Sequence, residues 1–222
     1  MISIIKRVLY SVIKNSQIDY VKKGYYKKNI HGDKNVILCT GAYLENVVCN
    51  ISGNENSICI QPGARITNTA LHFQGSHHQL IIGKNVTIDG AALVFEDSDC
   101  KITIGENTTI YNSTHIAAVE RGSEIRIGSD CLFSGYVDIR TTDSHSIIDL
   151  QTRKRINFAK NVTIGNHVWL GGHATVLKGS TIGNNCVIGM KSLVTKDIPN
   201  NCVAAGSPAV VIKENVTWKF ER

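Results

Sequence analysis

The chain has 222 residues, of which 42% are hydrophobic and only 6% aromatic, and its formal net charge is +6. Residues 1–28 hold seven basic side chains against Asp19 alone, so the remaining chain is neutral, which argues against a nucleic-acid groove on its main body. The seven cysteines are odd in number and include no Cys-x-x-Cys pair, which argues against a disulfide framework and favours a reducing compartment.

The first predicted element is a short helix within residues 2–13, inside a basic N-terminal segment of residues 1–30. Its apolar residues recur at helical spacing, and Lys6, Arg7 and Lys14 interrupt them. The apolar run is too short for a signal sequence or a membrane span. Two roles stay open, a cap over one end of the fold and a basic amphipathic helix against an anionic membrane or polymer.

A repeat begins after this segment and sharpens along the chain. Between residues 36 and 80 it is ragged, which we interpret as irregular early coils with loops, one of them at residues 53–57. From Ile82 onward a seven-residue motif, Ile-Gly-Lys-Asn-Val-Thr-Ile in its first copy, returns at intervals of 22, 23, 37 and 18 residues, starting at Ile104, Ile127, Ile164 and Ile182. The interval of 37 predicts one long insertion, at about residues 140–161.

The clearest repeat lies between residues 164 and 198. Aliphatic residues recur every six positions, each followed four residues later by a mostly small residue, and glycine directly follows four of the aliphatic ones. A period of six fits neither a helix nor a simple strand, but it fits a solenoid whose three-sided coil has 18 residues. The interpretation is a parallel β-helix over residues 31–204, with glycine tolerating the corner dihedrals and residues 205–222 as a tail.

Two features of the regular half suggest chemistry. His145 opens the long insertion, and long loops on rigid scaffolds often carry function. Between residues 161 and 213 four lysines face Asp197 alone, a row that suggests phosphate binding, although a merely basic surface would give the same composition. The four are Lys178, Lys191, Lys196 and Lys213.

The motif Ile164-Gly165-Asn166-His167-Val168-Trp169-Leu170-Gly171, with the closing motifs at residues 194–199 and 204–208, resembles the hexapeptide-repeat O-acetyltransferases that use acetyl-coenzyme A. That family includes galactoside, maltose and xenobiotic acetyltransferases. Within it, the chain is most similar in kind to enzymes that acetylate bacterial surface polysaccharides, including polysialic acid. The resemblance covers roughly residues 80–213, and it implies an all-β, left-handed parallel β-helix that assembles as a homotrimer.

The resemblance also implies roles for particular residues. His145, 24 residues before Trp169, would be the general base that deprotonates a sugar hydroxyl, and Trp169 would line the acceptor or pantetheine pocket. Asp143 could orient the His145 ring. Further coenzyme contacts are expected at Gly172, Lys178, Met190, Thr195, Lys196, Ala205 and Lys213, and acceptor contacts at Asn112, Glu120 and Asp143. Met190 and Val210 depart from the family, which often has a small and a basic residue there.

The resemblance implies acetyl-coenzyme A as cosubstrate, no metal, a glycan acceptor, and a cytoplasmic enzyme that could associate peripherally with the inner membrane. Other readings remain. A small-sugar or xenobiotic acetyltransferase would share the fold. A zinc protein like the gamma-type carbonic anhydrases would need a third histidine beside His167 and His173. A non-catalytic scaffold would neither bind coenzyme A nor consume the thioester.

Overall fold

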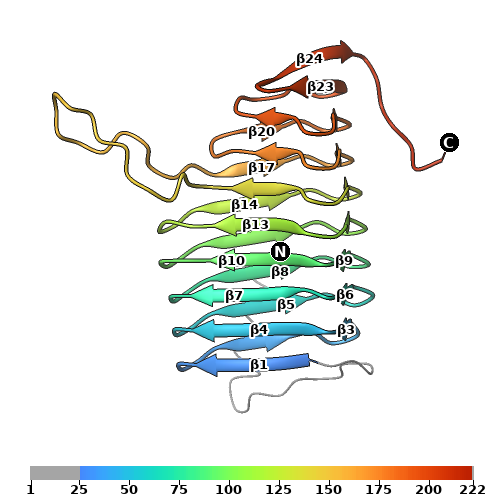
Figure 1. Cartoon of the computed structure of the whole chain (residues 1–222). Helices are drawn as coiled ribbons and strands as arrows, with labels where there is room; N and C mark the ends of the chain where they lie inside the picture. The colour runs from blue at the N-terminus through green and yellow to red at the C-terminus, as the bar shows by residue number, and fades with distance from the viewer. Residues whose placement is uncertain (1–25, 222) are drawn as a thin grey trace, which may run out of the picture.

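The computed structural model describes residues 26–221, and within this range the chain forms 24 strands and no helix. Figure 1 shows the strands stacked in coils around a prism with three faces, each face formed by one sheet. The fold is therefore the parallel β-helix that the six-residue spacing predicted. The helix expected within residues 2–13 lies outside the described residues.

Up to β22 each sheet takes every third strand of the chain, and β23 and β24 both join sheet 3. Sheet 1 contains, in order, β1 (Tyr26–His31), β4 (Val47–Ser52), β7 (Ala70–Gln74), β10 (Ala91–Phe95), β13 (Thr114–Ala118), β16 (Asp138–Arg140), β19 (Thr175–Val176) and β22 (Leu193–Val194). Sheet 2 contains β2 (Val36–Leu38), β5 (Ser57–Ile60), β8 (Gln79–Ile82), β11 (Lys101–Ile104), β14 (Glu124–Ile127), β17 (Val162–Ile164) and β20 (Thr181–Ile182). Sheet 3 contains β3 (Tyr43–Glu45), β6 (Arg65–Thr67), β9 (Thr87–Asp89), β12 (Thr109–Ile110), β15 (Leu132–Phe133), β18 (Trp169–Leu170), β21 (Val187–Ile188), β23 (Cys202–Gly206) and β24 (Ala209–Glu214).

The core consists of inward-facing side chains stacked in columns. Successive strand residues point to opposite faces, and parallel pairing in register places like residues above one another. One column in sheet 2 is made of isoleucine alone and each member is at most 3% exposed: Ile60, Ile82, Ile104, Ile127, Ile164 and Ile182. Burying one such side chain contributes roughly 1.5–3 kcal/mol. These columns therefore hold the coils together, as the sequence predicted for the inward hexad positions.

The glycines after the inward aliphatic residues have a different role from the predicted one. None of the four between residues 164 and 190 that follow such residues has a positive φ; the left-handed corner positions are taken by residues such as His167 and Asn185. A Cβ on Gly165 would lie 2.6 Å from Asn184 Oδ1, one coil away. Glycine is needed because neighbouring coils approach too closely for a side chain. The explanation from corner dihedrals is wrong.

The early coils are regular, which corrects the interpretation of residues 36–80 as irregular. β4 and β7 pair in register from Val48 with Ala70 through Ser52 with Gln74. The early strands of sheet 1 are longer, with six residues in β4 against two in β19. The early strands of sheet 2 are longer too, with four residues in β5 against two in β20. The additional residues interrupt the six-residue period in each early coil and hide it in the sequence.

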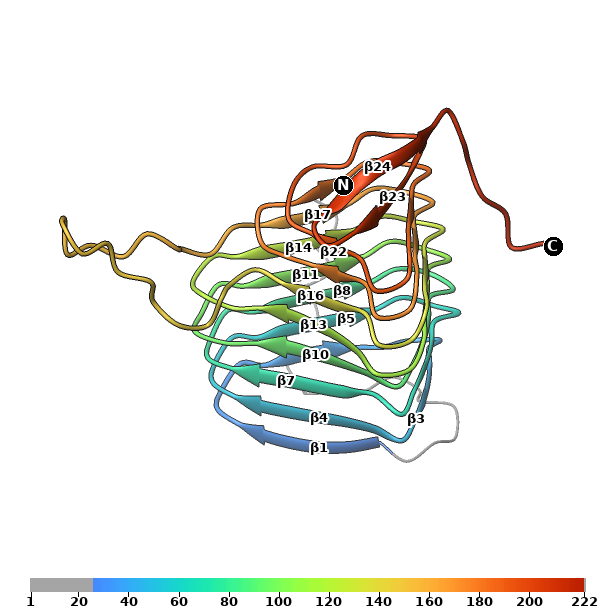
Figure 2. The same ribbon diagram turned by 45° about the horizontal axis from the view of Figure 1, so that its top comes forward.

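The predicted long loop leaves the prism after β16 and returns at β17, and Figures 1 and 2 show it projecting away from the coils. Its arms are joined by an antiparallel bridge between Ile148 and Arg155. We call the corner where it emerges, between sheets 1 and 2, the loop edge (residues 119–123, 141–161, 177–180 and 195–198). The corner between sheets 3 and 1 is the groove edge (residues 111–113, 134–136, 171–173 and 189–191).

The segment predicted as a tail contains a strand. β24 pairs antiparallel with β23 and extends sheet 3, and Figure 1 shows the chain then leaving on the side away from the loop. Trp218 returns to the prism, where it is 7% exposed and donates from Nε1 to the His167 carbonyl at 2.8 Å. The tail therefore covers part of sheet 3.

Candidate active site

His145 lies at the base of the loop, at the loop edge. Its backbone N–H donates to the Asp143 carbonyl at 2.8 Å, and its own carbonyl accepts from Asn157 Nδ2 at 2.8 Å. The side chain is exposed, and among residues 26–221 neither ring nitrogen has a hydrogen-bond partner. The backbone of His145 is thus fixed while its imidazole is available to exchange a proton with a ligand.

The Asp143 carboxylate is engaged elsewhere than at the His145 ring. Its Oδ2 accepts hydrogen bonds from Lys178 Nζ and from Asn157 Nδ2, the latter at 2.9 Å. These two bonds, the one from Lys178 first, hold the pKa of Asp143 below its usual value. Lys178 also donates to the Asn157 carbonyl at 2.8 Å. Within one chain, Asp143 and Lys178 therefore tie the loop to the next coil.

Glu120 is an anchor for the same loop. Its two carboxylate oxygens accept from both terminal nitrogens of Arg155, from the Thr142 hydroxyl and, at 3.2 Å, from the Ala159 N–H. The Arg155 bonds are the main cause that lowers the pKa of Glu120. Both side chains are less than one quarter exposed. The Glu120 carboxylate thus already accepts from four donors within the chain. A contact between Glu120 and the acceptor stays a prediction.

A groove of about 530 Å³ runs along the groove edge across three coils. Trp169 forms one wall, is 37% exposed and donates from its indole Nε1 to Ser134 Oγ at 3.2 Å. Met190, 70% exposed, and Val187 add further apolar surface. A groove with an apolar wall and glycine backbone suits a flexible apolar chain such as a pantetheine arm.

Gly172 is open toward this groove. A Cβ added to it would meet nothing closer than 3.5 Å, so, unlike Gly165, its lack of a side chain is not explained by coil stacking. Its N–H has no acceptor within residues 26–221, whereas its carbonyl accepts from Lys191 N–H at 2.9 Å. The residues here fit the predicted cosubstrate, since the site offers space and an unpaired backbone donor.

Two pairs of stacked rings lie beside the groove, and the sequence did not indicate them. Tyr136 and His173 stack with their ring centroids 4.7 Å apart and planes 2° apart. His167 stacks on Trp218 at 4.4 Å, and Trp218 lies 6.0 Å from Trp169. The six-residue offset between His167 and His173 was visible in the sequence, but their aromatic partners come from another coil and from the tail, which no local spacing indicates.

The predicted lysine row is divided by the fold. Lys178 and Lys196 lie at the loop edge with Thr195, whereas Lys191 lies at the groove edge. Lys213 lies on β24, where it pairs with Val203 of β23.

Asn112, a predicted acceptor contact, lies at the groove edge, where its carbonyl accepts from Tyr136 N–H at 2.7 Å. Ala205 lies in β23, above Gly189.

One chain does not bring the two halves of the predicted site together. His145, Asp143, Glu120 and Thr195 lie at the loop edge, whereas Trp169, Gly172, Met190 and Asn112 lie at or beside the groove edge. Sheet 1 separates these edges, since its strand β19 (Thr175–Val176) lies between Gly172 and Lys178 in the same coil. Figure 1 shows the loop and sheet 3 on opposite sides of sheet 1.

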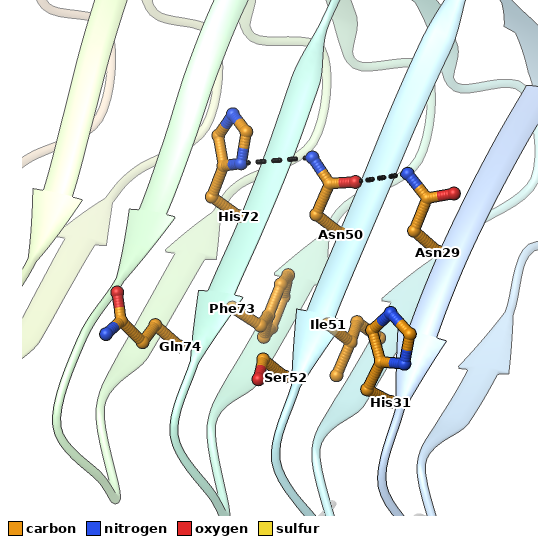
Figure 3. A pocket seen from close by; sticks show the side chains of 8 residues that line it. All are labelled: Asn29, His31, Asn50, Ile51, Ser52, His72, Phe73 and Gln74. Carbon is orange, nitrogen blue, oxygen red and sulfur yellow. Dashed lines mark hydrogen bonds between the residues drawn. The ribbon is translucent and has the colours of Figure 1, made fainter.

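A second hollow, of about 370 Å³, lies on sheet 1 at the first coils (Figure 3). There Asn29 Nδ2 donates to Asn50 Oδ1 at 2.7 Å, and Asn50 Nδ2 lies 3.3 Å from His72 Nδ1. It contains none of the predicted site residues. In the described part of the chain, no three His, Cys, Asp or Glu side chains are grouped closely enough to hold a metal ion.

Comparisons with known proteins agree with this architecture. The family model for the bacterial transferase hexapeptide (six repeats) matches residues 161–196. The solved polySia-specific acetyltransferase NeuO is 31% identical with a TM-score of 0.84, covering 88% of this chain and 89% of that one. The solved polysialic acid O-acetyltransferase OatWY is 35% identical with a TM-score of 0.83, covering 89% and 92%.

Curated relatives match over a shorter stretch. The polysialic acid O-acetyltransferase of Escherichia coli O1:K1 is 39% identical over 94 residues, 42% of this chain and 31% of the relative. The galactoside O-acetyltransferase of Escherichia coli (strain K12) is 42% identical over 90 residues, 40% and 44% respectively. The matched stretch therefore spans less than half the length of these two curated relatives.

The coils, the loop and the groove define a left-handed parallel β-helix built from hexapeptide repeats. The chain is 31% and 35% identical to two solved acetyltransferases and covers 89% and 92% of their chains. This similarity identifies the family within the fold class. The chain belongs to the hexapeptide-repeat acetyltransferase family.

Proposed function

We propose that the protein transfers the acetyl group of acetyl-coenzyme A to a hydroxyl of a glycan, and that this glycan is a bacterial surface polysaccharide such as a capsule, polysialic acid or O-antigen. The observation that carries the proposal is the similarity over 88% and 89% of this chain to two solved enzymes named for polysialic acid acetylation. The exposed imidazole at the loop edge and the apolar groove supply the two functional halves.

The reaction is a direct attack of the glycan on the thioester. The His145 imidazole takes the proton of the hydroxyl as its oxygen bonds to the thioester carbonyl carbon. The negative charge that develops on the carbonyl oxygen needs a donor, and the N–H of Gly172, a residue that lines the groove, would supply it. The carbon–sulfur bond then breaks, the imidazolium returns the proton to the sulfur, and the O-acetyl glycan and the free thiol leave.

We propose that the catalytic site forms between copies in a homotrimer. The loop edge of one copy would lie against the groove edge of the next, which would bring His145 to the thioester without crossing sheet 1. In such a head-to-tail interface each copy contributes a different surface to each of its two neighbours, and three copies close a ring. The exposed apolar residues Ile147, Leu150 and Phe158 of the loop support burial against another surface.

The coenzyme would lie with its pantetheine arm in the groove and its phosphates near Lys191 and Lys213. Val210 and Ile212 of β24 are 59% and 63% exposed, and they would pack against the adenosine end, with Val210 standing where the family often has a basic residue. Thr195, Lys196 and Asp143 would reach the coenzyme or the acceptor from the neighbouring copy's loop edge.

A small-sugar acetyltransferase is the second candidate. It is favoured by the match to the galactoside O-acetyltransferase of Escherichia coli (strain K12), which is 42% identical over 90 residues. The groove and His145 would serve either acceptor, so the surface beyond them decides between a polymer and a monosaccharide.

One assay separates these possibilities. The full chain is mixed with acetyl-coenzyme A, and thiol release is followed with polysialic acid, an uncharged polysaccharide and a simple galactoside. We expect the fastest release with an anionic polymer, and preference for the galactoside would favour the second candidate. No release with any acceptor, together with no coenzyme A binding, would favour a non-catalytic scaffold. His145→Ala should lower turnover by about 10² to 10⁴-fold while coenzyme A still binds.

We further propose that the enzyme works in the cytoplasm, where its cosubstrate is available, and that the basic N-terminal segment can hold it at an anionic inner membrane. Seven free cysteines, six of them buried, support a reducing compartment. The described residues include no helix of the length and apolar character that a bilayer crossing requires. Fractionation of cells that express the full chain, with and without residues 1–25, tests both proposals.

A further inference from the structure

Asn157 is a buried polar residue in an otherwise exposed loop. It is 8% exposed, whereas its neighbours Ile156 and Phe158 are 62% and 61% exposed. The loop projects from the prism (Figure 1). The hydrogen-bond partners of the Asn157 carboxamide, Asp143, His145, Ile147 and Arg155, all belong to the loop. A buried carboxamide is tolerated only when its hydrogen bonds are made, so its partners show what it holds.

All the hydrogen-bonding capacity of the Asn157 carboxamide is used. Nδ2 donates to Asp143 Oδ2 at 2.9 Å and to the His145 carbonyl at 2.8 Å. Oδ1 accepts from Ile147 N–H at 2.7 Å and from Arg155 Nε at 3.2 Å. A carboxamide offers two donors and two acceptor sites in one plane, and the four partners match that pattern. Reversing the amide would set donor against donor and acceptor against acceptor.

The backbone of Asn157 is held as firmly. Its carbonyl accepts from Lys178 Nζ at 2.8 Å and from a terminal nitrogen of Arg155 at 3.2 Å. Lys178 belongs to the coil above the loop, and Arg155 is bound by Glu120 from the coil below. Asn157 is thus connected to the prism through the coils on both sides of the loop. Its carboxamide in turn restrains Asp143 and the backbone of His145.

We propose that Asn157 is the positioning residue of the catalytic base: its carboxamide locks the backbone of His145 to Asp143 and so fixes where the imidazole meets the acceptor hydroxyl. The inference rests on the proposed function, because it assumes that His145 is the base. Catalysis by a positioned group is sensitive to distance, and a shift of about 1 Å can cost about 10²-fold in rate. Neither ring nitrogen of His145 has a hydrogen-bond partner among residues 26–221, so the place of the imidazole depends on how the backbone of His145 is held.

The test is Asn157→Asp in the full chain. This substitution keeps the size of the side chain but removes the donor to the His145 carbonyl and sets a second carboxylate against Asp143. We expect kcat to fall about 10²-fold with little change in the affinity for coenzyme A, because Asn157 is buried within the loop and does not line the groove. The melting temperature should stay within about 2 °C, because the loop lies outside the core columns. Gln151→Ala is the matched control in the same loop, and it should retain wild-type kcat.

A double-mutant cycle separates positioning from general damage. Where His145 is already replaced by Ala, adding Asn157→Asp should reduce the residual turnover no further. A further large loss in that background would contradict the proposal, and so would wild-type kcat in Asn157→Asp alone. If His145→Ala itself retains turnover, the assigned base is wrong. If His145→Ala is inactive and Asn157→Asp is fully active, the proposed function stands and the positioning role does not.

Discussion

Arg155 and Glu120 are 35 residues apart in the sequence and form a bidentate ion pair. This pair links the returning arm of the protruding loop to the coil below it. Charge-assisted pairs of this geometry are stronger than single contacts. Both side chains are shielded, at 23% and 21% exposed. The loop that carries His145 is therefore attached to the prism at a second point away from its ends.

Removing this attachment should loosen the loop without unfolding the prism. In Arg155→Ala we expect trypsin to cleave after Arg153 and Lys154 roughly 10- to 100-fold faster, because losing charge-assisted hydrogen bonds worth about 1.5–3 kcal/mol raises the open population. The melting temperature should be almost unchanged. Arg121→Ala is the control, because its pair with Asp99 is exposed and such pairs contribute little. Equal cleavage of both variants would show that the pair does not hold the loop.

The attachment should also depend on pH in one direction. Hydrogen bonds from Arg155 and Lys178 lower the pKa of Glu120 and of Asp143 below their ordinary values of 4.5 and 3.8. Carboxylates with lowered pKa stabilise the folded loop fully above those ordinary values, and the stabilisation is lost as the pH falls through the lowered ones. The protection factors of the loop amides, which are corrected for the pH dependence of intrinsic exchange, should therefore stay constant from about pH 8 to 5 and fall only below about pH 4. Loss of protection near pH 6 would contradict this cause.

Gly165 and Gly172 lie at consecutive corners of the prism and should respond differently to substitution by alanine. Gly165→Ala places a Cβ 2.6 Å from Asn184 Oδ1 and should destabilise the fold by about 1–3 kcal/mol, seen as a lower melting temperature. Gly172→Ala has no atom within 3.5 Å, so its melting temperature should be unchanged. It should instead weaken coenzyme A binding by about 10-fold or more, because the methyl group enters the groove. Titration calorimetry and thermal denaturation distinguish the two effects, and tight binding by Gly172→Ala would place the coenzyme elsewhere.

The sequence indicated the coils because their cause is local. Each inward residue, such as Ile164 or Ile182, must meet its equivalent one coil later, so the period appears directly in the chain. The reason for the glycines was missed because contact between coils, such as Gly165 against Asn184, joins residues that no strand pattern links. The regularity of the first coils was hidden by longer strands such as β4.

The site was only partly accessible to the same reasoning. His145 and Trp169 could be proposed from the insertion and the family motif, but their placement at opposite edges of sheet 1 depends on how the coils wind. Lys178 looked like a phosphate ligand from charge alone, yet its ammonium binds Asp143 and the Asn157 carbonyl. Asn157 gave no signal, because a lone asparagine in a polar loop is common and its four side-chain bonds form only after the loop folds.

The proposed function depends most on a catalytic site shared between two copies of the chain. Mixing two inactive variants tests this directly. His145→Ala and Trp169→Ala, each inactive alone, are co-expressed with different tags and purified as mixed assemblies. If each site takes its loop edge from one copy and its groove edge from the next, every mixed trimer has about one intact site in three. We predict recovery of about a third of wild-type turnover. Mixed assemblies that stay as inactive as either variant would show that His145 and Trp169 do not act across a shared interface.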